Sequence, residues 1–450
     1  MPSRNSLFAA VRAKLSREDG SNLAHSFQLL LILAAARVTL FLVFMLLLRK
    51  MGTAQFGTFF LGYNTLAFVP LIADMGIGQT FVRHISFYRT SRPDFSAYLH
   101  WLFFLLKIAS VAILIGVSIP ALPLIVRFLN LHREPHLLML AVMGSGAVIL
   151  SEYVGAVFQS QCLFRRYELY LFLRNTLFLA AAIVMTWFLR AYLTPTFLIL
   201  ALVLVHLGLV VSAAPYLARL WHEKSGEFSE FRSSLFRYSG WLTVAAICFA
   251  LYRRMDVYLL SHFRTVHEVG IYSVAVVLVE PVAMISPALV TVFLPRLSAE
   301  PTPDRLRRHT YLVASICGIV LFGSFLYLGV LRLIFPYLGS QYREALPLVG
   351  VLLMSTVLLI AYNVLSLAFL ALDRPDVFGQ IALVMAIGSL AANWFLIPPY
   401  GVLAAGTVYG LTQLFGVVLA TFFVHRLLRE SKPALQIEPT PLQSSESILS

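Results

Sequence analysis

Four positively charged side chains lie inside apolar stretches of this chain, where a charge is costly. Arg37, Lys107 and the adjacent pair Arg253 and Arg254 are flanked by runs of Leu, Phe, Val and Ala. One such cation at the centre of a bilayer costs about 2.5–3.5 kcal/mol on insertion scales. Four of them facing lipid would cost on the order of 10 kcal/mol. The fold must therefore supply water, counter-ions or an anionic ligand to these groups.

Arginine is well suited to bind phosphate, because its planar guanidinium donates two parallel hydrogen bonds. The four cations therefore predict a basic, water-filled cavity that binds a phosphorylated ligand. The alternative is internal ion pairing, and Asp256, three residues after Arg253, is a candidate partner on the same helix. Arg37 and Lys107 have no acid within one helical turn, which favours a binding role for them.

Four acids also lie in or at the edge of apolar stretches: Asp74, Glu152, Asp256 and Glu280. Glu280 precedes Pro281, which kinks a helix and frees a carbonyl, so a proton or Na⁺ could bind there. The alternative is that these acids are counter-ions, and the number of cations nearby favours it. The segment Asp74-Met-Gly-Ile-Gly78 is interpreted as a turn at a helix end.

These residues must be positioned by helices that cross a membrane. The chain of 450 residues is 59% hydrophobic and only 12% charged, whereas soluble domains are about a quarter charged. A helix needs about 20 apolar residues to span a bilayer. The sequence predicts an all-α polytopic membrane protein with twelve spans, at 27–48, 57–80, 97–119, 136–158, 169–189, 195–217, 239–263, 269–293, 310–334, 346–371, 376–397 and 401–427.

The net charge of +13 does not indicate nucleic-acid binding, because the basic residues are distributed over short loops rather than gathered on one face. With the N-terminus inside, 21 Lys and Arg fall in cytoplasmic segments and 8 on the opposite side. This bias predicts that both termini are cytoplasmic.

The longest loop between spans divides the chain into two halves of six helices. The predicted organisation is a cytoplasmic segment (1–26), a first bundle (27–218), a cytoplasmic loop (219–238), a second bundle (239–428) and a disordered tail (429–450). Residues 49–83 align with 262–296 without a gap, so that the two halves are related by one constant offset. An even number of spans per half makes this a parallel repeat, which predicts a substrate site between the bundles near the midplane.

Several motifs of catalysis are absent. The sequence has no GxxxxGK[ST] loop, no HExxH and no DxD-like pair for Mg²⁺. Its three cysteines form no CxxC, and the extracytoplasmic loops are mostly shorter than about 17 residues. These absences predict a transporter rather than an enzyme, without a metal site or cofactor. Coupling to an H⁺ or Na⁺ gradient stays open.

Three segments resemble the bacterial polysaccharide-export flippases, such as those for O-antigen units, of the multidrug/oligosaccharidyl-lipid/polysaccharide (MOP) exporter superfamily. The first is Arg49-Lys-Met-Gly-Thr-Ala-Gln-Phe-Gly57, which leads to Asp74–Gly78. The second is Tyr252-Arg-Arg-Met-Asp-Val-Tyr-Leu-Leu260, followed by Val269-Gly-Ile-Tyr-Ser-Val-Ala275 and Phe293-Leu-Pro-Arg-Leu-Ser298. The third is Asn393-Trp-Phe-Leu-Ile-Pro-Pro-Tyr-Gly-Val-Leu-Ala-Ala405.

The resemblance implies two MATE-like six-helix bundles forming a V around a cationic cavity that works by alternating access. It implies an undecaprenyl-diphosphate-linked glycan as substrate, the bacterial inner membrane as location, and polysaccharide polymerase or export machinery as partners. We expect Arg37, Lys107, Arg253 and Arg254 to bind the diphosphate and proximal sugars. Asp256, Glu280, Glu152 and Asp74 would then be counter-ions or couple an ion.

Two other functions are consistent with such a chain. One is a multidrug or cation antiporter of the same fold, but the cations at mid-membrane argue against a site for cationic drugs. The other is a membrane polysaccharide polymerase or ligase, which would need a larger extracytoplasmic loop. Relatives that flip the peptidoglycan precursor typically have fourteen spans, so the twelve predicted here argue against that role.

Overall fold

The computed structural model describes most of the chain, and the described part is helical. It covers residues 32, 34–74, 77–78, 81–82, 85–86, 88, 93–131, 134–220, 228–299, 303–372 and 374–430. No strand occurs within these residues, so the predicted all-α class is confirmed. The predicted N-terminal segment 1–26 and residues 431–450 of the predicted tail lie outside the described residues.

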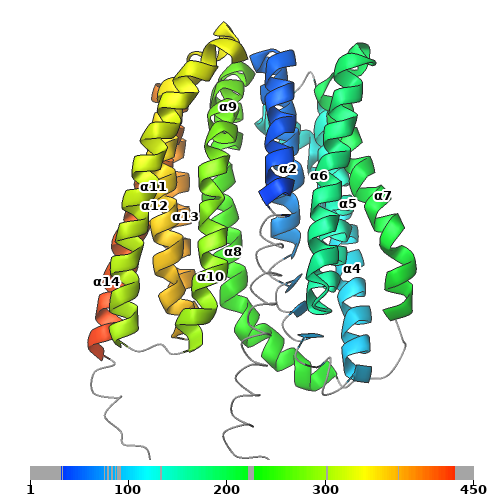
Figure 1. The fold of residues 1–450 in the computed structure, drawn as a ribbon. Coiled ribbons are helices and arrows are strands. Elements are labelled where there is room, and N and C mark those ends of the chain that lie inside the picture. The colour runs from blue at the N-terminus through cyan, green and yellow to red at the C-terminus, as the bar shows by residue number, and fades with distance from the viewer. Residues whose placement is uncertain are drawn as a thin grey trace, which may run out of the picture.

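The first bundle begins with a helix over residues 34–50. It continues with α2 (Thr53–Asp74), α4 (Pro93–Phe128), α5 (Pro135–Ser160), α6 (Phe164–Trp187), the 3₁₀ turn η1 (Arg190–Tyr192) and α7 (Pro195–Leu220) (Figure 1). Proline starts α4, α5 and α7, because a helix leaves its first N–H groups unpaired and proline lacks one.

The second bundle repeats this order. It consists of α8 (Phe228–Phe263), α9 (Val266–Ala283), α10 (Ile285–Ala299), α11 (Pro303–Leu338), the 3₁₀ turn η2 (Ser340–Tyr342), α12 (Ala345–Ala371), α13 (Pro375–Tyr400) and α14 (Val402–Glu430). The predicted span 269–293 is divided between α9 and α10 at Met284, just after Pro281, because proline removes a helical hydrogen bond.

Ten helical segments among the described residues are long and apolar enough to cross a membrane. The helix over 34–50 and α8 occupy the other two predicted positions, so the described residues contain helices at all twelve predicted positions. Large apolar side chains face outward on their perimeter, for example Phe395 and Leu333, which are 73% and 74% exposed. Such exposure is expected where lipid rather than water surrounds the protein.

The segment between the bundles is shorter than the loop predicted at 219–238. Helix α7 continues to Leu220 and α8 begins at Phe228, so residues 228–238 are helical. The sequence explains this difference, because Phe228, Phe231 and Leu235 recur at the spacing of an amphipathic helix. The polar character of the segment had indicated a loop.

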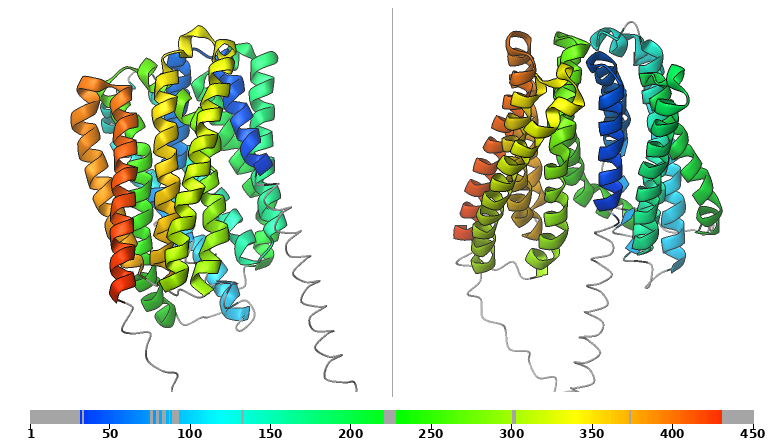
Figure 2. Two further views of the ribbon diagram at one scale, coloured as in Figure 1. Left: turned by 60° about the vertical axis from the view of Figure 1, so that its left-hand side comes forward. Right: turned by 45° about the horizontal axis from the view of Figure 1, so that its top comes forward.

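The two bundles have equivalent packing. Helix α5 packs against α2, α4 and α7, and its counterpart α12 packs against α9, α11 and α14. Pro123 of α4 and Pro336 of α11 are related by the same offset that aligns 49–83 with 262–296. The right-hand view of Figure 2 shows the two groups of helices side by side. The repeat therefore extends beyond the two aligned segments.

Helices α2 and α9 cross at two glycines and join the bundles there. A Cβ atom on Gly270 would overlap the carbonyl oxygen of Thr53 and lie 2.8 Å from its carbonyl carbon, and one on Gly57 would lie 2.6 Å from the Gly270 nitrogen. No side chain fits at either position. Beside this crossing, Thr53 Oγ1 lies 2.7 Å from His267 Nδ1. Gly57 aligns with Gly270 in the repeat, so equivalent positions of the two halves touch.

Two turns add hydrogen bonds between the bundles at the same end. After α4, the Asn130 amide donates to a carbonyl in the last turn of α8 at 2.7 Å, and Ser261 Oγ donates to the Leu129 carbonyl at 2.6 Å. At η2, the Tyr342 hydroxyl donates to the Met51 carbonyl at 2.8 Å. Burial raises the pKa of Tyr342 to about 12, so it remains a donor at neutral pH.

Residues 51–57, 128–131, 261–270 and 341–342 are called the joined end below. The ribbons of the two bundles meet there, at the top of Figure 1, and diverge toward the opposite end. Leu129 and Tyr342 occupy equivalent positions of the repeat, so each half supplies one turn. The joined end thus has approximate two-fold symmetry.

The third sequence motif also ends at this side of the molecule. Gly401 has φ +60°, and a Cβ there would lie 2.8 Å from Glu268 Oε2. Glu268 pairs with Arg264 at 2.9 Å, and Arg264 Nη1 donates to the Pro398 carbonyl at 3.3 Å. The glycine therefore gives the ion pair room to close the end of α13.

We expect Gly401→Ala to lower the stability of the protein by about 1–3 kcal/mol, because alanine is strained at positive φ and would displace the carboxylate. Thermal unfolding in detergent, followed by size-exclusion chromatography, measures this loss. Gly388→Ala is the matched control, since its Cβ would meet no atom within 4 Å. Equal melting temperatures for both variants would contradict the expectation.

Candidate functional site

Two adjoining cavities have volumes of about 460 and 520 Å³; the first lies within the second bundle, and the second lies between the bundles. Both are lined by Arg254, Val276 and Glu280. The first is further lined by Arg253, Asp256, Tyr272, Val279, Ala283, Leu352, Thr356 and Tyr409. The second is further lined by Arg37, Leu40, Phe41, Phe44, Phe60, Tyr63, Val277 and Met284. Three of the four predicted cations therefore share one region.

Arg253 and Glu280 face each other in the first cavity. Arg253 Nη2 lies 3.8 Å from Glu280 Oε2, and the guanidinium also lies 5.7 Å from the centre of the Phe249 ring. Glu280 comes from α9, beside its Pro281 kink, and Arg253 comes from α8. The geometry is that of the counter-ion alternative considered for Glu280, and it partly neutralises Arg253.

Asp256 does not form the ion pair with Arg253 that its spacing suggested. Its carboxylate accepts hydrogen bonds from the Tyr272 hydroxyl of α9 and from the Val257 N–H, the latter at 2.7 Å. Asp256 is buried, with 4% of its surface exposed. The i,i+3 spacing to Arg253 could not reveal this, because the tyrosine lies on another helix.

Arg254 is held by a neutral partner. Its Nη1 donates to Oδ1 of Asn64 on α2 at 3.0 Å. Arg37, on the helix over 34–50, has an exposed side chain that lines the second cavity beside Tyr63. Neither arginine forms an ion pair with any carboxylate of the described residues. These two cations are therefore available to an anionic ligand.

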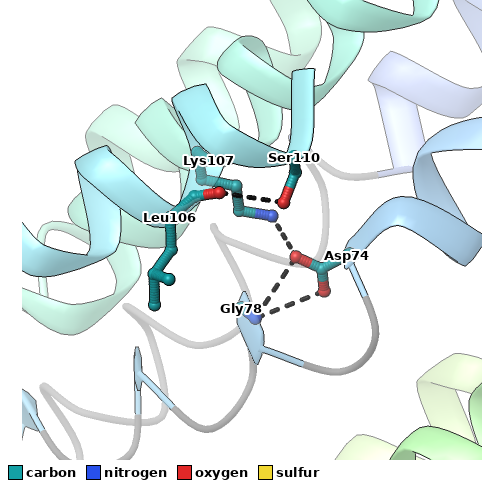
Figure 3. Close-up of polar contacts among 5 residues, drawn as sticks. All are labelled: Asp74, Gly78, Leu106, Lys107 and Ser110. Carbon is teal, nitrogen blue, oxygen red and sulfur yellow. Dashed lines mark hydrogen bonds and ion pairs between the residues drawn. The ribbon is translucent and has the colours of Figure 1, made fainter. Parts of the chain in front are cut away.

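Lys107 was expected in the cavity, but the structure places it inside the first bundle. Figure 3 shows its ammonium donating to the Asp74 carboxylate, which also accepts from the Gly78 N–H at 3.2 Å. Lys107 is only 2% exposed and lines neither cavity. The sequence could not indicate this pair, because Asp74, the partner of Lys107, lies on α2 and not within a turn of Lys107 on α4.

The described residues after α2, Ile77 and Gly78, are helical, and the N–H of Gly78 donates to the Asp74 carboxylate. The interpretation of this segment as a helix-end turn stays a prediction. Met75 and Gly76 lie outside the described residues. Glu152 on α5 is exposed and lines neither of the two cavities. Asp74 and Glu152 are thus not brought together with the arginines.

We expect Lys107→Met to destabilise the protein by about 3 kcal/mol, because it leaves the carboxylate of Asp74 without its cation. The double variant Asp74→Asn with Lys107→Met should recover most of this loss, since neither charge remains. The yield of monodisperse protein and its melting temperature in detergent measure both effects. A single variant as stable as the wild type would show that the pair contributes nothing.

Sequence reasoning missed the neutral and partner residues of the site. Asn64 and Tyr63 touch or line it, yet each lies in an aromatic or aliphatic stretch without a motif; Tyr272 lies in the second motif but was not identified as a site residue. The sequence did contain a signal for Asn64, because a polar amide inside the predicted span 57–80 indicates a buried hydrogen bond. Arg174 on α6 is a further cation within a span, and it donates to Asn175 at 3.3 Å.

The site has the chemistry of an anion-binding cavity. Three arginines face two carboxylates, so one positive charge is left over in formal terms. Guanidinium groups donate planar pairs of hydrogen bonds, which match phosphate oxygens. Among the described residues, no group of three or more His, Cys, Asp or Glu side chains could hold a metal ion.

A family model described as "Polysaccharide biosynthesis protein" matches residues 23–299 of this chain. This range is more than half of the 450 residues and includes Arg37, Arg253, Arg254, Asp256 and Glu280. No curated protein matches the sequence.

Several solved structures share the fold. An inward-facing multidrug resistance MATE transporter of the MOP superfamily has a TM-score of 0.69 at 12% identity, covering 89% of this chain and 99% of that one. The lipid II flippase MurJ in an inward closed conformation has a TM-score of 0.67 at 12% identity, covering 89% and 87%. The Vibrio cholerae MATE transporter VcmN in its bent form has a TM-score of 0.55 at 16% identity, covering 91% and 98%.

Proposed function

The chain belongs to the polysaccharide biosynthesis protein family of the MOP superfamily, and we propose on that premise that it flips an undecaprenyl-diphosphate-linked oligosaccharide across the bacterial inner membrane. The resemblance and the MATE-like fold noted in the sequence are confirmed. The proposed product is the same lipid-linked glycan in the outer leaflet, ready for polysaccharide assembly. No covalent bond changes.

One observation gives the strongest support for a diphosphate-linked substrate. Arg37 and Arg254 reach the second cavity from opposite bundles, and neither has a carboxylate partner among the described residues. Arg253 adds a third guanidinium beside Glu280. A diphosphate carries the charge and the oxygen geometry that such a set binds. The lipid tail would remain in the bilayer between helices.

The joined end supports a direction of access. The excess of Lys and Arg supports a cytoplasmic location for the opposite end of the molecule, and with that orientation we propose that the conformation described here is inward-facing. In the proposed cycle the diphosphate enters from the cytoplasmic leaflet. The bundles then separate at the joined end and close at the cytoplasmic end, which exposes the cavity to the outside.

The antiporter alternative fits the arginines less well. A site for cationic drugs requires free carboxylates, whereas Asp256 accepts from Tyr272 and Glu280 lies near Arg253. The polymerase alternative is less well supported, because the similar solved structures are transporters and a flippase. We retain Asp256 and Glu280 as candidates for binding a coupling proton or Na⁺, with no other cofactor proposed.

The test is the leaflet location of the lipid-linked oligosaccharide after depletion of the protein. Accumulation on the cytoplasmic face, reversed when the protein is restored, is the expected result. Intermediates that still reach the outer face, but remain unpolymerised, would overturn the proposal in favour of a polymerase. Increased sensitivity to cationic drugs, with normal glycan traffic, would favour the antiporter.

A further inference from the structure

Asn64 joins the cavity to the contact between the bundles. It lies on α2, is fully buried at 0% exposure, and bonds to Arg254 of α8 twice. Its amide nitrogen approaches the Arg254 main-chain carbonyl at 3.4 Å, and its amide oxygen accepts from Arg254 Nη1 at 3.0 Å. Both the backbone and the guanidinium of this arginine are thus fixed by one side chain of the other bundle.

Arg254 occupies the central position among the cavity cations, because it lines both cavities. A guanidinium has five N–H donors, and Asn64 accepts from Nη1 alone. The remaining donors can serve an anion. A free arginine side chain loses rotamer entropy when a ligand immobilises it, so an arginine that is already oriented binds more tightly.

We propose that Asn64 is a positioning residue, which aims Arg254 at the diphosphate of the substrate while the bundles have this arrangement. The inference rests on the proposed function. It adds a mechanism of release, since Asn64 and Arg254 belong to bundles that must move apart. When they separate, Arg254 loses its orientation and its affinity for the diphosphate falls in the outward-facing state.

The next residue, Thr65, offers a control that tests whether Asn64 has a purely structural role. Thr65 also bonds across the same pair of helices, accepting from the Tyr258 hydroxyl at 3.2 Å, and is 3% exposed. Neither Thr65 nor Tyr258 lines a cavity. Thr65→Val therefore removes a hydrogen bond between the bundles and leaves Arg254 untouched, which makes it the matched control for Asn64→Ala.

The experiment measures binding of undecaprenyl diphosphate to the full-length protein in lipid nanodiscs. Asn64→Ala should weaken binding about tenfold, as expected for loss of one oriented charged hydrogen bond. Asn64→Asp should weaken it further, because a carboxylate would neutralise Arg254. Thr65→Val should bind as the wild type does. Inorganic pyrophosphate, added as a competitor, should displace the lipid from the wild type more effectively than from Asn64→Ala.

A double-mutant cycle separates positioning from stability. In an Arg254→Ala background, Asn64→Ala should cause no further loss of affinity, since it acts through the arginine. Additive losses, or an Asn64→Ala variant that binds as tightly as Thr65→Val, would overturn the inference while the proposed function stands. Unchanged binding by Arg254→Ala alone would instead overturn the proposed function and the inference with it.

Discussion

Replacing Arg254 by alanine is expected to reduce translocation of the lipid-linked glycan about 100-fold while the protein still inserts and folds. Hydrogen bonds to charged groups contribute about 1.5–3 kcal/mol each, and this arginine lines both cavities without a carboxylate partner among the described residues. Arg37→Ala should have a similar but smaller effect, because its side chain is exposed and reaches the second cavity only.

The measurement is the initial rate of glycan appearance in the outer leaflet of reconstituted vesicles. Arg190→Ala serves as the control, since that arginine is exposed on η1 and lines neither cavity. Arg254→Lys keeps the charge but loses the planar fork and should recover only part of the rate. If Arg254→Ala matched Arg190→Ala in rate, the cationic cavity would not be the substrate site.

A valine at Gly270 is expected to prevent the joined end from closing. The first carbon of any side chain there would overlap the Thr53 carbonyl group, whose main-chain atoms cannot move aside. The population should shift toward the outward-facing conformation, and translocation should stop. A population moves from 1:99 to 99:1 for about 5.5 kcal/mol; overpacking costs about 1–3 kcal/mol or more, which is enough to shift the population toward the outward-facing state.

Accessibility to a thiol reagent measures this shift. The three native cysteines are first replaced, and a cysteine is placed at Thr53, which is buried with 7% exposure. A membrane-impermeant maleimide added outside should label it rapidly in Gly270→Val and slowly in the parent protein. Gly208→Val is the control, because nothing lies within 4 Å of a Cβ at that position. Equal labelling in all three proteins would show that this crossing does not close the outer side.

Much of the fold could be predicted because it depends on composition and periodicity along the chain. The twelve spans, the two halves and the constant offset between them all follow from patterns that do not require knowledge of packing. The helical start of α8 was missed, since a polar amphipathic segment and a loop share their composition. The match of Gly57 with Gly270 in the aligned repeat was already visible, but their contact was not.

The candidate site was predicted only in part, because ion pairs form between helices and spacing reports neighbours within one helix. Arg37, Arg253 and Arg254 line the cavities as expected. Lys107 does not, since its acid comes from the end of another helix. Whether the arginines bind substrate, and whether Asp256, Glu280, Glu152 or Asp74 couple an ion, stays a prediction.

The glycine crossing has a consequence for how this chain originated. Gly57 and Gly270 are equivalent positions that touch each other, so a two-fold axis passes between them. Two separate copies of one six-helix half could make the same contact, each offering its own glycine to the other. An ancestral half-length chain could therefore have worked as a parallel homodimer. In the present chain, the covalent connection after Leu220 would hold the halves at high effective concentration without determining how they dock.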